Sequence, residues 1–290
     1  MTLFFHDLVR HDFLIYAVVG AALASVACGI VGSLVVAKRT TYLAGAIAHS
    51  VLGGMGAALY FKRVHGIEWL TPLTGAVTAA VIAALIISFV TVSGKQREDT
   101  VISAVWAIGM AVGISFISAT PGYYEDLMSY LFGNILMIGT GDLWHMAFLD
   151  AAVLAVTILF YDRFLVVSFQ PELAALRGLN IYFYHTLMIL MMSLTVVLLT
   201  QIVGLIMVIA LLALPAATAF KFVNRLWSAM FAAGFICMIV SFLGLAVSYE
   251  PELPAGATII EIAGLVYILS LTGKNIYLKF FRKTDSSLKS

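Results

Sequence analysis

Apolar segments long enough to cross a hydrocarbon core of about 30 Å as helices recur along the whole chain. Only 11% of the 290 residues are charged, and the mean hydropathy is +1.06; a soluble domain carries roughly 25% charged residues. No connection between the segments is long enough to form a second hydrophobic core. We therefore expect an all-α polytopic membrane protein, with one transmembrane domain over residues 1–282 and a disordered tail over 283–290.

Apolar runs bounded by polar or helix-breaking residues predict about nine membrane spans, within a range of eight to ten. The nine spans lie near residues 14–37, 43–61, 70–92, 100–118, 143–160, 183–200, 203–219, 228–248 and 257–273. The stretch 127–139 is apolar but too short to cross, so we expect a re-entrant or interfacial segment packed on protein. The sixth and seventh spans meet at Thr200-Gln201, which predicts a tight hairpin.

The distribution of basic residues predicts the orientation of the chain in the membrane. An outside N-terminus and an inside C-terminus put these thirteen basic residues in the cytoplasm: Lys38, Arg39, Lys95, Arg97, Arg163, Arg177, Lys221, Arg225, Lys274, Lys279, Arg282, Lys283 and Lys289. Only Arg10, Lys62 and Arg63 then lie outside. Cytoplasmic loops are enriched in Lys and Arg, so this is the expected orientation, in a multi-pass protein of the cytoplasmic (inner) membrane.

One histidine lies deep inside an apolar helix. His49 is eleven residues beyond Lys38, which is about 16 Å at the helical rise and close to the membrane midplane. Ionisable groups are costly at that depth and mark pathways or sites. An imidazole among closely packed helices indicates a path for a metal ion. The alternative is a structural histidine, hydrogen-bonded to a neighbouring helix carbonyl.

Two carboxylates are also expected within or near the hydrocarbon. Glu261 lies early in the last span and Asp150 about two turns into the fifth. An unpaired carboxylate at the core centre costs on the order of 2–3 kcal/mol, so both should face protein or water. Each is a candidate metal ligand. For Glu261 the alternative is a side chain that reaches to the outer interface, and the same ambiguity applies to Asp150.

The longest cytoplasmic connection, residues 161–182, contains the start and the end of a short helix. Pro171 and Glu172 are residues typical of a first helical turn, and Gly178 is typical of a helix end. A helix near 171–177 would carry Glu172, Leu173, Leu176 and Arg177 at the inner face, where it could dock a cytosolic partner. An ordinary interfacial loop helix is the alternative.

Pro215 lies inside the seventh span and removes one backbone hydrogen bond, so a kink is expected there. With Gly204 behind it, this span is a candidate gating element. The alternative is a static kink whose freed carbonyl is satisfied by Thr218 or a neighbour.

The sequence also excludes several kinds of function. Neither Ser93-Gly-Lys95 nor Thr272-Gly-Lys274 has the earlier glycine that a phosphate-binding loop requires. No nucleophile–base arrangement is visible, so the chain is not expected to be an enzyme. Any ATP must bind to a separate chain, no permanently bound cofactor is expected, and a net charge of +1 gives no basis for nucleic-acid binding.

Several stretches of the chain together resemble one known family, the membrane subunits of ATP-binding-cassette importers for zinc, manganese or iron. Ala-Gly-Ala-Ile-Ala-His-Ser-Val-Leu-Gly-Gly (44–54) is similar to the family's Gly-Asp-Ala-Ile-Ser-His-Ala-Val-Leu-Pro-Gly. The stretches 98–113, 129–136, 203–219 and 253–259 are similarly close, and Phe169-Gln-Pro-Glu-Leu-Ala resembles the helix that such permeases insert into their ATPase. The resemblance covers nearly the whole chain.

The resemblance implies a permease that imports a divalent metal ion and works as a dimer of two copies or of two related chains. It also implies two cytosolic ATPase subunits and an extracellular or periplasmic metal-binding protein. The family's motif pairs an aspartate with its histidine, but here Gly45 takes the aspartate position. Losing a hard oxygen ligand favours zinc over manganese or iron. The alternatives are a permease for a chelated metal or another small solute, and a secondary carrier driven by an ion gradient.

Overall fold

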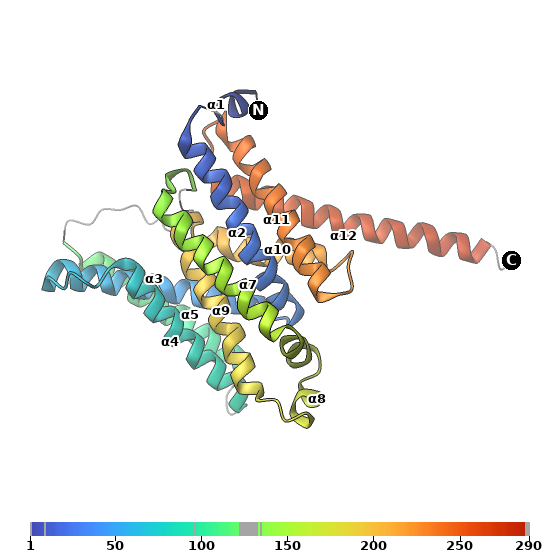
Figure 1. The fold of residues 1–290 in the computed structure, drawn as a ribbon, viewed down its shortest axis with the longest axis horizontal. Coiled ribbons are helices and arrows are strands. Elements are labelled where there is room, and N and C mark those ends of the chain that lie inside the picture. Colours follow the sequence, from blue (N-terminus) through green and yellow to red (C-terminus); the bar gives the residue numbers. More distant parts are fainter. Residues whose placement is uncertain (1, 9, 95–96, 122–132, 134, 288–290) are drawn as a thin grey trace.

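The computed structural model describes residues 2–8, 10–94, 97–121, 133 and 135–287. Within these residues the chain forms helices and no strand (Figure 1). The elements are α1 (Thr2–Leu8), α2 (Asp12–Ala37), α3 (Thr41–His65), α4 (Pro72–Ser93), α5 (Glu98–Ala119), η1 (Ile135–Met137), α7 (Thr140–Phe169), α8 (Pro171–Leu176), α9 (Ile181–Val203), α10 (Leu205–Ala219), α11 (Leu226–Tyr249) and α12 (Ala255–Ser287).

The described helices include 8 that are long and apolar enough to cross a membrane, and α10 is a shorter apolar helix of 15 residues. Together they coincide with the nine expected spans, which confirms an all-α polytopic membrane protein. At the helical rise α10 is only about 22 Å long, less than the roughly 30 Å of a hydrocarbon core.

The fifth span is longer than predicted. Helix α7 continues through residues 161–169, which the sequence analysis placed in a connection, and has 30 residues in all. The charged pair Asp162 and Arg163 lowers the hydropathy of this stretch, but Phe164 and Val167 are fully buried in it. The Arg163 guanidinium also donates a 2.8 Å hydrogen bond to the hydroxyl of Tyr184 on α9. Packing against α9 therefore extends the helix beyond the apolar run.

Two further boundaries differ from those expected. The turn between α9 and α10 is the single residue Gly204, not Thr200-Gln201, and its φ of +84° is readily adopted only by glycine. Helix α12 extends to Ser287, beyond the end near residue 273 that was expected for the last span. Residues 288–290 lie outside the described residues, and the disordered tail over 283–290 stays a prediction. Residues 274–283 of this helix contain Lys, Leu and Arg, which are good helix formers.

Most of the short apolar stretch 127–139 lies outside the described residues, namely 127–132 and 134. Its described end packs on protein, as predicted for a segment too short to cross. Gly133 lies directly against the α9–α10 turn at Val203 and Gly204. Ile135 and Ile138 are buried, and Ile138 contacts α2 at Gly20.

Glycines bring the helices into two tightly packed groups. In the first group, α3 contacts α5 where Gly53 faces Gly109, and it contacts α4 where Gly54 faces Gly75. The second group contains α2, α10, α11 and α12: Gly29 of α2 lies against α11, and Gly32 against the α10 backbone. A Cβ at Gly29 would lie 2.7 Å from the Cα of Gly234. Small residues are what allow membrane helices to approach this closely.

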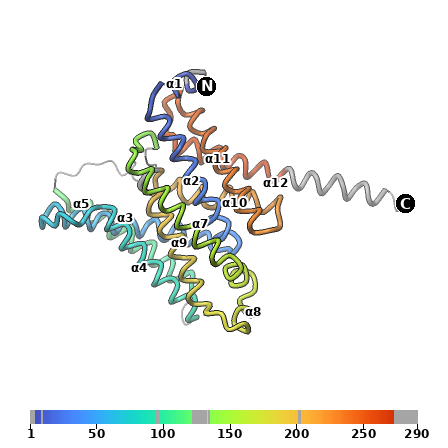
Figure 2. Tube along the Cα trace, in the orientation of Figure 1, coloured from blue at the N-terminus to red at the C-terminus, as the bar shows by residue number. Residues whose placement is uncertain are grey.

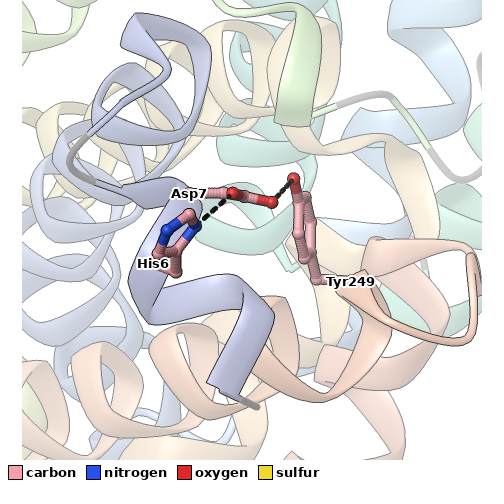
Figure 3. Close-up of polar contacts among 3 residues, drawn as sticks. All are labelled: His6, Asp7 and Tyr249. Atoms are coloured by element: carbon pink, nitrogen blue, oxygen red, sulfur yellow. Dashed lines mark hydrogen bonds and ion pairs between the residues drawn. The ribbon is translucent and has the colours of Figure 1, made fainter.

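The two ends of the bundle are held by different contacts. Helix α1 lies at one end and α8 at the opposite end (Figure 2). At the α1 end, Phe4 is fully buried against Phe242 and Tyr249 of α11. The Tyr249 hydroxyl donates a 3.0 Å hydrogen bond to Asp7, and His6 lies 3.1 Å from the same carboxylate (Figure 3). Helix α1 is thus tied to the end of α11.

Candidate functional site

His49 lies at the centre of α3, half-buried, with its ring stacked on Trp106 of α5. The two ring centroids are 4.8 Å apart and the planes differ by 13°. The Nδ1 atom is enclosed and has no hydrogen-bond partner in the described part of the chain. A buried nitrogen without a partner is energetically costly. No hydrogen bond from Nδ1 to a helix carbonyl is therefore present among the described residues, and the metal-binding role of His49 stays a prediction.

Gly45 lies one turn before His49 on the same face of α3 and under the same indole. A Cβ at Gly45 would lie 3.7 Å from Cζ3 of Trp106 and 3.8 Å from Cδ1 of Ile209 on α10. These are ordinary van der Waals contacts, so a methyl group fits, while a longer side chain meets Trp106 and Ile209. Trp106 therefore closes the space beside His49 where the family pattern places a carboxylate.

The two candidate carboxylates lie on other helices. Asp150 of α7 is 6% exposed beside Ala27 and Cys28 of α2, and one of its oxygens has no hydrogen-bond partner among the described residues. Glu261 is exposed on α12. Helix α3 packs mainly on α4, α5, α9 and α10, so neither carboxylate is brought to His49. Among the described residues no group of three or more His, Cys, Asp or Glu side chains could hold a metal ion.

Helix α8 confirms the short helix expected in the cytoplasmic connection. It begins at Pro171 and ends at Leu176, with Arg177 as its C-cap and Gly178 at a φ of +70°. Ala174 is fully buried and anchors it, whereas Leu176 is 86% exposed. Glu172 and Arg177 are exposed and Leu173 is half-buried. A hollow of about 470 Å³ lies along residues 169–173. The helix thus presents a mixed apolar and charged surface beside a concavity.

The Gly204–Pro215 segment has the geometry of a broken helix pair. Pro215 is buried inside α10, and Gly204 is the turn that precedes α10. The hydroxyl of Thr218 donates a 2.8 Å hydrogen bond to the carbonyl of Leu214. It therefore does not satisfy the carbonyl of Leu211, which Pro215 leaves without its usual helical donor. The gating role of this span stays a prediction.

Two contacts were not anticipated from the sequence. Trp106 was not recognised as the partner of His49, because their meeting depends on how α5 packs on α3. Just beyond the C-terminal end of α2, the Lys38 ammonium lies 2.6 Å from Nδ1 of His185, a buried residue near the start of α9. Burial lowers the pKa of Lys38 to about 8. One indication of this contact was present in the sequence: His185 lies at the start of one apolar run and Lys38 at the end of another.

Comparison with known proteins gives a consistent result. Residues 10–274 match the model of the ABC 3 transport family. The chain is 40% identical over 263 residues to a membrane protein of Synechocystis sp., covering 91% of each. It is 32% identical over 268 residues to the manganese transport system membrane protein MntC of Listeria monocytogenes, covering 92% of this chain and 93% of that one. PsaBC from Streptococcus pneumoniae, solved in complex with Fab, has a TM-score of 0.83 at 30% identity and covers 96% of this chain and 99% of its own.

Proposed function

The chain belongs to the ABC 3 transport family, and from this premise we propose that it moves a divalent metal ion inward along a path that passes His49. Family membership makes it the membrane subunit of an ATP-binding-cassette transporter, with the ATPase on a separate chain, and so decides against the secondary carrier. The observation that carries the metal path is the enclosed, unpartnered Nδ1 of His49, held at mid-helix by the stack on Trp106.

Zinc is the cargo we propose first. In the part of the chain that the structure describes, neither Asp150 nor Glu261 is brought to His49, and no group of three or more His, Cys, Asp or Glu side chains could hold an ion. Zinc binds imidazole readily, whereas manganese prefers carboxylate and water. Manganese is the second candidate, because relatives such as MntC of Listeria monocytogenes are named for manganese transport.

A second copy of the chain would complete the path. Helix α5 has 22 residues, of which only Ile102 and Gly113 are buried among its described side chains. Trp106 is 42% exposed and Ile108 63% exposed on this helix. A partner permease that covers α5 would bring its own His49 and Trp106 to the same region. Two histidines could then share the ion with water, which one chain does not achieve.

The ATPase is proposed to dock on α8, and a metal-binding protein to deliver the ion at the α1 end. Exposed Leu176 and the charged pair Glu172 and Arg177 would contact the ATPase. Ala174 is buried in the permease and so would carry the movement of the partner into α7 and α9, as a rigid-body displacement. Replacing Glu172 and Leu173 by alanine should leave ATPase activity but abolish uptake; undiminished uptake would contradict this assignment.

The decisive test measures zinc and manganese uptake by the chain reconstituted with its ATPase and metal-binding protein. His49→Ala should abolish ATP-dependent uptake while the complex still assembles. His65→Ala is the matched control, because His65 is exposed at the far end of the same helix. Uptake that survives His49→Ala at the wild-type rate would make His49 structural and move the search to Asp150 and Glu261. Competition between the two ions decides the preferred cargo.

A further inference from the structure

An apolar groove of about 550 Å³ runs between α2, α7 and α11 on the side of the bundle that would face lipid. Its walls include Leu154 and Ile158 of α7 and Phe231, Phe235 and Met238 of α11. All five side chains are between 40% and 75% exposed, so the described part of the chain leaves the groove uncovered. In a bilayer an exposed apolar surface lies against lipid, whose acyl chains are as apolar as leucine, and a groove in that surface can hold one of those chains.

The groove has the depth of one leaflet of a bilayer. On α11 its lining extends from Trp227 to Met238, which is about 16 Å at the helical rise. Half of a hydrocarbon core of about 30 Å is nearly the same length. The groove begins at the cytoplasmic end of α11, which the basic residues place inside. It therefore fits acyl chains that enter from the inner leaflet.

A hollow of about 460 Å³, lined by apolar and polar side chains, continues the groove at the end that the basic residues place inside. Tyr161 and Trp227 line both spaces, and the Tyr161 hydroxyl accepts a 3.1 Å hydrogen bond from the backbone N–H of Trp227. Tyrosine and tryptophan are enriched where hydrocarbon meets headgroups. Beside apolar side chains such as Leu165 and Phe169, this hollow contains the polar residues Gln170, Asn224 and Arg225. Arg225 is exposed, and its guanidinium makes no hydrogen bond or ion pair with the residues the structure describes.

We propose that this site binds one anionic phospholipid of the inner leaflet, with acyl chain in the groove and phosphate at Arg225. The site follows the order of the parts of a phospholipid. The apolar groove would hold an acyl chain, Tyr161 and Trp227 would lie at the boundary with the headgroup, and Arg225 would face the phosphate. The inner leaflet is the one that carries anionic lipids. The rival occupant is the ATPase, because Phe169 and Gln170 directly precede α8, but a soluble protein would not reach the groove at hydrocarbon depth.

The proposal is tested by titrating the delipidated, purified chain with phosphatidylglycerol and with phosphatidylcholine and counting bound lipids by native mass spectrometry. The wild-type chain should bind phosphatidylglycerol on the order of fivefold more tightly, the effect of one basic residue at an anionic surface. Arg225→Gln should remove this preference, whereas Arg97→Gln, an exposed cytoplasmic arginine outside the site, should keep it. Equal binding of both lipids by the wild-type chain would overturn the proposal.

A second variant tests the groove itself. Leu154→Trp fills it and should weaken the binding of both lipids, while Leu265→Trp, exposed on α12 away from the site, should not. If Leu154→Trp binds both lipids as tightly as the wild-type chain does, the lipid is held by surface charge alone and the groove is not its site. A photoreactive residue at position 224 should label phospholipid in membranes; labelling of the ATPase in its place would assign the hollow to that partner.

Discussion

Adding one methyl group at Gly53 should separate the two helices that carry His49 and Trp106. A Cβ at Gly53 would lie 2.7 Å from the carbonyl oxygen of Gly109, and ordinary contact begins at 3.4 Å. The two backbones must therefore part by about 0.7 Å, the difference between those distances. Overpacking of this kind costs about 1–3 kcal/mol. Gly264 provides the matched control, because a Cβ there would have no neighbour within 4 Å in the same kind of apolar helix.

Both Gly53→Ala and Gly264→Ala gain about 1 kcal/mol of helix propensity, so the difference between them isolates the contact with α5. That difference should appear as a Tm gap on the order of 2–10 °C. The two cysteines of the chain, Cys28 and Cys237, are both buried, so a fluorogenic thiol reagent reports unfolding directly. If both variants raise the Tm equally, α3 and α5 do not approach as closely as described, and the geometry around His49 must be redrawn.

Three further predictions concern the ends of the helices. Burial lowers the pKa of Lys38 from 10.5 to about 8, so above pH 8 the unfolded chain binds more protons than the folded chain. The free energy of unfolding should therefore rise from pH 8 to about pH 10.5, by at most about 3 kcal/mol. A denaturation midpoint that does not change with pH over this range, or one that still rises in Lys38→Met, would contradict this prediction. His6 and then Tyr249 lower the pKa of Asp7 below 3.8 through hydrogen bonds, so their stabilisation is present above that value and is lost as the pH falls through the lowered one. Tyr249→Phe should therefore lose less Tm on acidification than the wild-type chain does, as measured by intrinsic fluorescence. Equal losses in the two proteins would show that the hydrogen bond from Tyr249 to Asp7 does not stabilise the fold. Asn180→Ala deletes the side-chain cap of α9 and should cost about 1 kcal/mol in thermal unfolding, whereas Asn180→Asp, which keeps an oxygen acceptor, should cost much less.

Local patterns in the sequence were sufficient to predict the spans and the short cytoplasmic helix. Pro171 and Gly178 act on their own segment of backbone, and long apolar runs have few alternatives in a membrane. The extension of α7 was missed because Asp162 and Arg163 lower the local hydropathy, and a loop was inferred from that drop. The helix continues there because Phe164 packs on α9. Such packing is not visible in a local window.

The candidate site was predicted only in part for the same reason. His49 was identifiable from its depth in an apolar run. Its partner Trp106 lies on another helix and reaches it because Gly53 and Gly109 let the backbones meet. Asp150 and Glu261 were grouped with His49 by depth, but depth does not say which face of which helix a side chain occupies.

The glycine contacts also determine where the molecule is stiff and where it can yield. Where two backbones are in direct contact, no side chain between them can change rotamer. Each group of helices should therefore move as a rigid body. Between the groups, α3 meets α10 through the side chain of Ile209, beside Gly45. Side chains can change rotamer, so the contact between α3 and α10 should deform more easily than the glycine contacts do. A force applied at α8 would first reach α7 and α9, the helices that α8 contacts, and α9 in turn contacts both α3 and α10. The two groups would then slide past each other one helical turn from His49, with little distortion inside either group.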